Sequence, residues 1–150
     1  MGVDSVLVGI AEIAQSGQRG DKAVARERFE RLWEEIGGEE GDPLHRCTLA
    51  HAMADVQEDV RVELMWDQRA LAAADLVTGE RMAEAGVALP VAGLYPSLHL
   101  NLGECYRRLG DHEQAREHLR LAREGLDALA DDDYGRLIRD GFARLEALVE

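Results

Sequence analysis

Apolar residues recur at helical spacing along almost the whole chain, and no segment shows the strict alternation of a half-buried β-strand. The most regular stripe consists of Ala115, Leu119, Ala122, Leu126 and Leu129. A helix with one apolar stripe is stable only when the stripe packs against another element. The pattern therefore predicts an all-α protein of seven helices in antiparallel pairs, with the last helix capping the array.

Capping residues predict where these helices begin and end. An aspartate before a helix accepts hydrogen bonds from the first N–H groups, and a glycine after it adopts the left-handed conformation that ends the helix. The residues with these two roles are Asp21, Asp42 and Asp111, and Gly17, Gly37 and Gly110. Residues 78–96 give a weaker signal, which predicts at most two helical turns and an apolar loop with three breaking residues, Pro90, Gly93 and Pro96.

The charge of the chain limits its partners. A length of 150 residues predicts a single domain over residues 1–150. Its 17 Lys and Arg residues stand against 30 Asp and Glu residues, which gives a net charge of −13. Such a surface repels phosphate backbones and anionic membranes. The composition therefore argues against nucleic acid and membrane partners and favours a partner with basic residues.

Several features predict a cytoplasmic protein. The N-terminal residues lack the positively charged leader of a signal peptide, and no apolar run approaches the length of a membrane helix. Two cysteines, Cys47 and Cys105, are too few for a disulfide framework. The basic residues are arginines except for Lys22, and the chain is rich in Ala, Gly and Val, which predicts a bacterial source of high GC content.

Residues 96–127 resemble a tetratricopeptide repeat, a helix–turn–helix unit of about 34 residues. The matching residues are Leu102, Gly103 and Tyr106 for the L-G-x-x-Y motif, residues 109–111 for the turn, and Ala115 and Ala122 for the two alanine positions. Gly103 is small where two helices cross closely, which predicts that Gly103 lies at such a crossing. The sequence departs from the family at His99, Leu119 and Asp127, where tryptophan, phenylalanine and proline are preferred.

The resemblance extends to the rest of the chain as architecture. It implies a short right-handed solenoid similar to small stand-alone bacterial members of the family. The predicted parts are a degenerate unit at 3–37, a second degenerate unit at 43–77, an insertion at 78–96, the clear repeat at 96–129 and a capping helix at 132–149. The residues of the capping helix that are predicted to be buried are Tyr134, Leu137, Ile138, Phe142, Leu145 and Leu148. Gly9 and Ala50 take the small positions of the first two units. The spacings from Gly9 to Ala50 and from Ala50 to Gly103 both exceed the usual repeat length, so an insertion at each junction is predicted.

Repeats of this family bind partners in a groove lined by the first helix of each pair. The resemblance implies a groove with Asn101, Glu104 and Arg108 on one side and His51 and Asp55 on the other. Asn101 both donates and accepts hydrogen bonds, so it suits the backbone of a bound segment. The function implied is a protein–protein interaction module that binds a protein or peptide and takes no cofactor. The apolar insertion at 78–96 is predicted to lie against the groove or a second subunit, which leaves a homodimer open.

An alternative is an enzyme or a metal-binding protein. His45, Cys47 and His51 offer ligand types that zinc prefers, and a site under the insertion at 78–96 is also considered. However, His45 would point away from a helix face shared by Cys47 and His51. The sequence contains no nucleophile motif, phosphate-binding glycine loop or paired metal-binding motif. A non-catalytic binding protein is therefore the main prediction.

Overall fold

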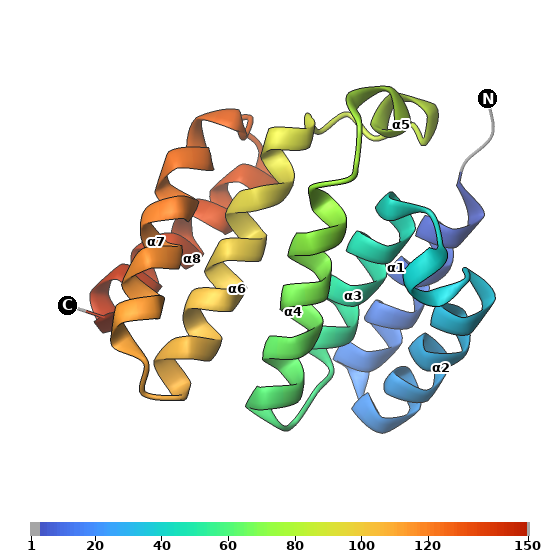
Figure 1. The fold of residues 1–150 in the computed structure, drawn as a ribbon, viewed down its shortest axis with the longest axis horizontal. Helices are drawn as coiled ribbons and strands as arrows, with labels where there is room; N and C mark the ends of the chain where they lie inside the picture. The colour runs from blue at the N-terminus through green and yellow to red at the C-terminus, as the bar shows by residue number, and fades with distance from the viewer. Residues whose placement is uncertain (1–3, 150) are drawn as a thin grey trace. The chain divides into compact units, whose positions relative to one another are not determined.

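The structure is a computed structural model and describes residues 4–149. Within these residues it contains α-helices, three short 3-10 helices and no strand (Figure 1). The α-helices are α1 (Ser5–Arg19), α2 (Lys22–Glu35), α3 (Pro43–Asp55), α4 (Val60–Ala74), α5 (Gly79–Glu84), α6 (Tyr95–Arg108), α7 (His112–Gly125) and α8 (Asp133–Val149). The 3-10 helices are η1 (Gly38–Glu40), η2 (Val91–Leu94) and η3 (Leu126–Ala128). The all-α prediction is confirmed, and the additional helix, α5, lies where at most two turns were predicted.

The predicted capping residues act at the helix ends. The side chains of Asp21, Asp42 and Asp111 accept hydrogen bonds from backbone N–H groups in the first turns of α2, α3 and α7. Gly37 and Gly110 follow α2 and α6 with φ angles of 99° and 84°, which residues with a β-carbon rarely adopt. Short-range chemistry therefore sets most of the helix boundaries.

The prediction that Gly17 ends the first helix is wrong. Helix α1 continues to Arg19, and Gly17 is buried within it. A β-carbon on Gly17 would lie 3.1 Å from Ala25 Cβ and 3.3 Å from Val56 Cγ1, so this glycine permits close packing. Gly9, which was predicted at the small position, has no such neighbour within 4 Å. Val3, the first residue of the unit predicted at 3–37, lies outside the described residues.

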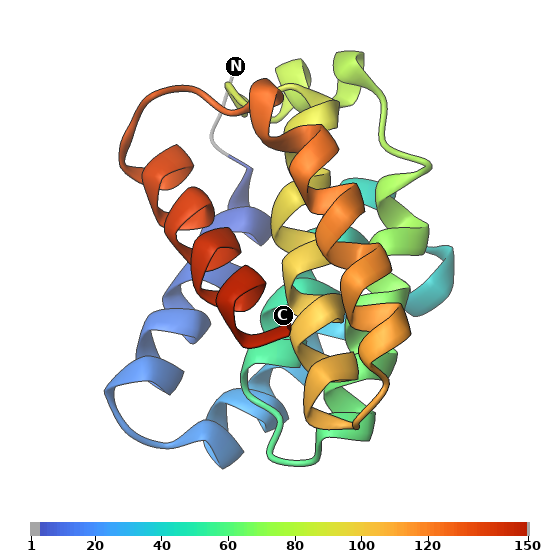
Figure 2. The same ribbon diagram turned by 90° about the vertical axis from the view of Figure 1, so that its left-hand side faces the viewer.

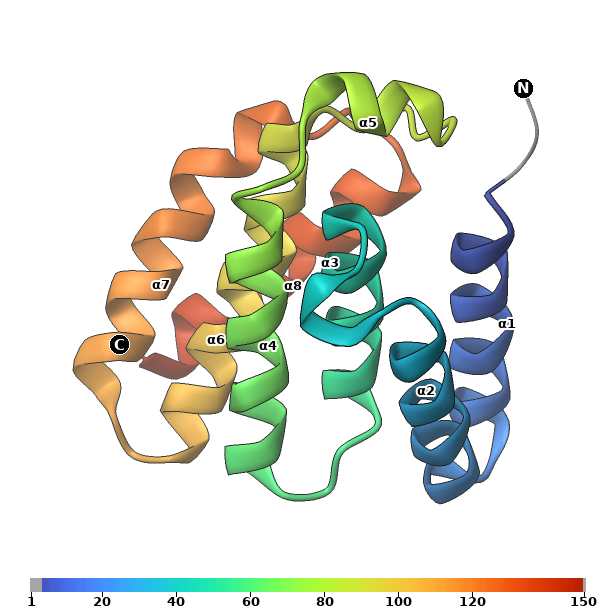
Figure 3. The same cartoon turned by 45° about the vertical axis from the view of Figure 1, so that its right-hand side comes forward.

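Two compact units make up the chain, residues 1–88 and residues 89–150. In the first unit, α1 pairs with α2 and α3 pairs with α4, and α3 also contacts α1 and α2. Figure 3 shows α5 near the end of this unit where α1 and α3 begin and α4 ends. Phe29, Leu49 and Met53 are fully buried, and the rings of Trp33 and Trp66 meet edge to face at 5.1 Å. The first two predicted helix pairs are thus present.

In the second unit, α6 and α7 form the pair with the repeat motif, and α8 packs against both (Figure 2). Its buried core consists of Leu100, Ala115, Leu119, Ala122, Leu129, Ile138, Phe142, Leu145 and Val149. Gly103 lies where three helices meet, since a β-carbon there would be 3.0 Å from Leu145 Cδ2 on α8 and 3.4 Å from the Ala115 carbonyl oxygen on α7. The predicted close crossing at Gly103 is therefore present.

Helix α8 exposes residues that were predicted to be buried. Tyr134, Leu137 and Leu148 retain 41%, 62% and 57% of their accessible surface. The prediction was wrong for these three because helical spacing identifies apolar positions without showing how many faces are covered. On α8 the covered face is a different stripe, through Ile138 and Phe142, that packs on α6 and α7.

Residues 78–96 are less regular than their neighbours, as predicted: they contain α5, η2 and the first residues of α6. Pro96 belongs to the first turn of α6, where its missing N–H leaves no helical hydrogen bond unmade. The apolar residues Val87, Leu89, Val91 and Leu94 are all partly buried. Docking of this segment on a groove or a second subunit stays a prediction. The prediction that residues 1–150 form a single domain likewise stays a prediction.

Within the described residues, none of the helices combines the length and the apolar character needed to cross a membrane.

Candidate functional site

A groove lies between α6 and α8 in the second unit. Its volume is about 360 Å³. Helix α6 contributes Leu100, Asn101 and Glu104 to one wall. Helix α8 contributes the other residues of the lining, which are Leu137, Ile138, Gly141, Arg144, Leu145 and Leu148. The groove is thus mostly apolar, with an amide and two charged groups.

Two of the predicted groove residues, Asn101 and Glu104, line this groove. The Arg107 guanidinium donates two hydrogen bonds to the Glu104 carboxylate, at 2.7 and 2.8 Å, and this contact lowers the pKa of Glu104. Arg108, the third predicted residue, lies outside the lining, with its Nε 3.6 Å from Glu104 Oε1. Two arginines therefore neutralise the acidic group on the α6 wall.

The α8 wall was missed by sequence reasoning, which treated α8 only as a cap. Among the residues that the structure describes, Arg144 makes no ion pair, so no carboxylate offsets the positive charge of its exposed guanidinium beside the groove. Gly141 lies between Leu137 and Arg144 and leaves space below Leu100, whose Cδ1 would be 3.6 Å from a β-carbon at Gly141. A glycine in the middle of an amphipathic helix was the available signal, because glycine disfavours a helix and needs a packing reason there.

His51 and Asp55, predicted for the opposite wall, belong to the first unit and are absent from the α6–α8 lining. His51 Nδ1 lies 3.8 Å from an oxygen of the fully buried Asp67. Burial alone would lower the pKa of His51, but the contact with Asp67 and the charges of Asp55 and Asp67 outweigh it and raise the pKa. Asp55 lines a smaller hollow between α1 and α3 that also includes Gly17 and Lys22. A shared groove for all five predicted residues stays a prediction.

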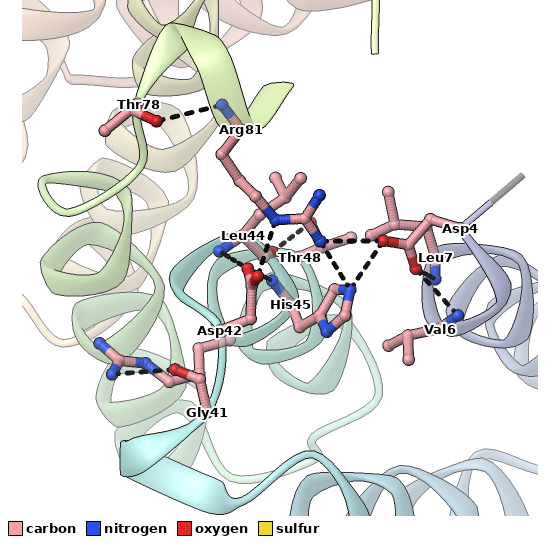
Figure 4. Close-up of polar contacts among 11 residues, drawn as sticks. Asp4, Val6, Leu7, Gly41, Asp42, Leu44, His45, Thr48, Thr78 and Arg81 are labelled. Carbon is pink, nitrogen blue, oxygen red and sulfur yellow. Dashed lines mark hydrogen bonds and ion pairs between the residues drawn. The ribbon is translucent and has the colours of Figure 1, made fainter. Parts of the chain in front are cut away.

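A polar cluster in the first unit was not predicted (Figure 4). This Arg81 cluster consists of Asp4, Asp42, His45 and Arg81. Arg81 on α5 donates hydrogen bonds to Asp42 Oδ2 at 2.7 Å and to Asp4 Oδ2 at 3.0 Å. His45 Nε2 lies 2.8 Å from the same oxygen of Asp4. Sequence offers little signal for such a cluster, because its members are up to 77 residues apart.

The two aspartates of the Arg81 cluster also cap helices. Asp4 accepts hydrogen bonds from the N–H groups of Val6 and Leu7, and Asp42 accepts them from Leu44 and His45. Burial would raise the pKa of Asp4, but its bonds with His45, the Leu7 N–H and Arg81 lower it to about 2. The cluster therefore joins the N-terminal ends of α1 and α3 to α5.

The three residues of the zinc alternative have different surroundings. His45 contacts Asp4, and His51 lies beside Asp67. Cys47 is buried, and this burial raises the pKa of its thiol to about 12, which disfavours the thiolate that a metal requires. Among the described residues, these three side chains do not form a cluster of converging ligand atoms.

Comparison with known proteins gives one match. Residues 98–140 match the family model of the tetratricopeptide repeat, a segment that covers most of α6, all of α7 and the first half of α8. No curated protein and no solved structure matches the chain. Tetratricopeptide repeats generally mediate protein–protein interactions and are typically non-catalytic. The motif at Leu102, Gly103 and Tyr106 therefore correctly identified a tetratricopeptide repeat, which the family model places at residues 98–140.

Proposed function

We propose that this chain is an adaptor or regulatory module that binds a segment of another protein in the groove between α6 and α8. The observation that supports this most is the groove lining, because Asn101 and Glu104 come from the first helix of the matched repeat. Leu137 and Leu148 offer exposed apolar surface for the side chains of a bound segment. Burial of such surface provides most of the binding free energy in helix and peptide grooves.

The bound segment is proposed to contain apolar residues that alternate with polar ones. The amide of Asn101 would pair with its backbone or with a polar side chain. The preference for basic residues is supported by the net charge of −13 over the whole chain. The charge balance within the groove is different. Arg107 and Arg108 offset the negative charge of Glu104, whereas no carboxylate offsets the positive charge of Arg144 among the described residues. We therefore propose that basic residues lie outside the groove contact and speed association, while an acidic or polar group faces Arg144.

We also propose that the protein is cytoplasmic and bacterial. Support comes from two buried cysteines that form no disulfide in the described part of the chain, and from the arginine-rich composition.

Selection of peptides from a random library against the full chain tests the proposed function. The affinity of a selected peptide is then measured with the parent chain and with two glycine variants. Gly141→Leu fills the groove and should abolish binding, while Gly9→Leu adds the same side chain on the open surface of α1 and should leave binding unchanged. Amide chemical shifts should change along α6 and α8 when the peptide binds. Equal affinity of both variants, or shift changes confined to other helices, would place the function elsewhere.

A further inference from the structure

Helix α8 has two adjacent apolar faces, and the second unit covers only one of them. The covered face packs on α6 and α7 through Ile138, Phe142, Leu145 and Val149. The other face carries Leu137 and Leu148, which are both more than half exposed. These two leucines are eleven residues apart, which is about three helical turns, so they lie on the same side of α8. The helix therefore presents two exposed apolar contacts about 16 Å apart along its axis.

Two opposite charges lie beside this exposed face. Asp140 and Arg144 are both exposed, and within the described part of the chain neither has an ion-pair partner. Most other charged residues of α8 have a partner, since Arg136 is bonded to Asp131 and Asp133, and Glu146 is bonded to Arg123. Arg139 instead donates hydrogen bonds to backbone carbonyls at 126, 129 and 130. An Asp–Arg pair four residues apart is close enough to bond within a helix, yet this pair does not do so here. Both charges remain available to a second molecule.

The two pairs share one centre. The midpoint of Leu137 and Leu148 falls between residues 142 and 143, and the midpoint of Asp140 and Arg144 falls at residue 142. A two-fold axis placed beside this point would relate α8 to the antiparallel α8 of a second copy of the chain. Such an arrangement brings each Leu137 against Leu148 of the second copy and each Arg144 close to Asp140 of the second copy. A self-complementary surface of this kind is what a two-fold symmetric dimer requires.

We propose that two copies of this chain associate through antiparallel α8 helices, with Leu137–Leu148 contacts and Asp140–Arg144 ion pairs made twice. The local charge of α8 permits this, because its three acidic and three basic residues cancel, in contrast to the chain as a whole. Leu137, Arg144 and Leu148 also line the α6–α8 groove. A second copy and a bound segment would therefore exclude each other, so that self-association regulates access to the groove.

Sedimentation velocity of the full chain over a range of concentrations tests the dimer. The parent chain should show a reversible monomer–dimer equilibrium. Arg144→Asp and Asp140→Arg each place like charges opposite one another, and each should weaken the dimer about ten-fold or more. An equimolar mixture of the two variants restores both ion pairs and should form a heterodimer. The double variant Asp140→Arg/Arg144→Asp should form a homodimer again. Ala143→Asp, on another exposed side of α8, serves as the control and should dimerise like the parent.

Three results would overturn the dimer: a parent chain that stays monomeric at every concentration, charge variants that dimerise like the parent, or a mixture that fails to associate. Circular dichroism of each variant shows that the helices are intact. The variant Asp140→Arg also separates this inference from the proposed function, because Asp140 does not line the groove. It should bind a library-selected peptide at least as tightly as the parent. A dimer without any peptide binding would contradict the proposed function alone.

Discussion

Gly103 on α6 faces Leu145 on α8 so closely that a β-carbon on the glycine would lie 3.0 Å from Leu145 Cδ2. The Ala115 carbonyl oxygen on α7, at 3.4 Å, limits the same space from another side. The leucine side chain can move, but the backbone of α7 cannot move without disturbing the helix pair. The small position of the repeat motif thus acts as a three-helix contact.

Gly103→Leu should overpack this contact and lower the free energy of unfolding by about 1–3 kcal/mol or more. Urea unfolding followed by circular dichroism measures the change. Gly9→Ala is the matched control, because Gly9 is also helical but has no neighbour within 4 Å of a β-carbon. The control should raise stability by up to about 1 kcal/mol through helix propensity. Equal stability of Gly103→Leu and the parent would contradict the close crossing.

The Arg81 cluster predicts how stability depends on pH. The pKa of Asp4 falls from 3.8 to about 2 in the folded chain. Its carboxylate therefore stabilises the fold above pH 3.8, and this contribution is lost as the pH falls through about 2. The contribution is at most about 2 kcal/mol.

The variant Asp4→Asn retains a capping side chain but removes the charge. It should lower stability at pH 6 and should reduce the loss of stability between pH 4 and pH 2. Urea unfolding at several pH values measures both effects. Asp21→Asn, at a helix cap with no arginine partner among the described contacts, is the control and should change the pH dependence less. Identical pH profiles for Asp4→Asn and the parent would contradict the assigned role.

Cys47 should react slowly with thiol reagents while the chain is folded. Burial raises the pKa of its thiol to about 12, so almost no thiolate is present at pH 8. Mass spectrometry after brief treatment with iodoacetamide, with and without urea, measures the labelling of each cysteine peptide. Rapid labelling of Cys47 in the native chain would show that α3 is more accessible than its contacts indicate.

Asn101→Ala should weaken the binding of a library-selected peptide by about 1–3 kcal/mol if the amide pairs with the ligand in a buried setting. Folding should remain almost unchanged, because the side chain lies at the groove surface. Arg108→Ala should have a smaller effect, since Arg107 still neutralises Glu104. Gln114→Ala, on the exposed start of α7, is the control. Unchanged affinity in both Asn101→Ala and Arg108→Ala would move the binding site away from this groove.

Much of the fold could be predicted from sequence because it depends on short-range chemistry. Asp21, Asp42 and Asp111 cap helices as predicted, since a capping bond spans only two or three residues. The repeat motif around Gly103 was also identified correctly, because the motif encodes one local helix crossing.

The remaining errors have a common physical origin in long-range packing. Gly17 was assigned as a helix end, although its lack of a side chain serves a contact with Ala25 and Val56. Leu137 and Leu148 have the right spacing for burial, but spacing alone does not show that α8 has a second, uncovered face. The α8 wall of the groove was missed for the same reason. Asn101 and Glu104 on α6 were named in advance because the family motif carries their positions, and both line the groove.

The contact between Asp4 and Arg81 has a consequence for the order in which the first unit folds. It closes a loop of 77 residues that contains four of the longer helices of the chain. Closing a loop of this length reduces chain entropy, and only the prior packing of the helices in between brings the two ends together. The bond should therefore form after α1 to α4 have assembled and break before they separate. Amide protons of α5 should exchange with solvent earlier than those of α3, which makes the attachment of α5 the first step of local unfolding in this unit.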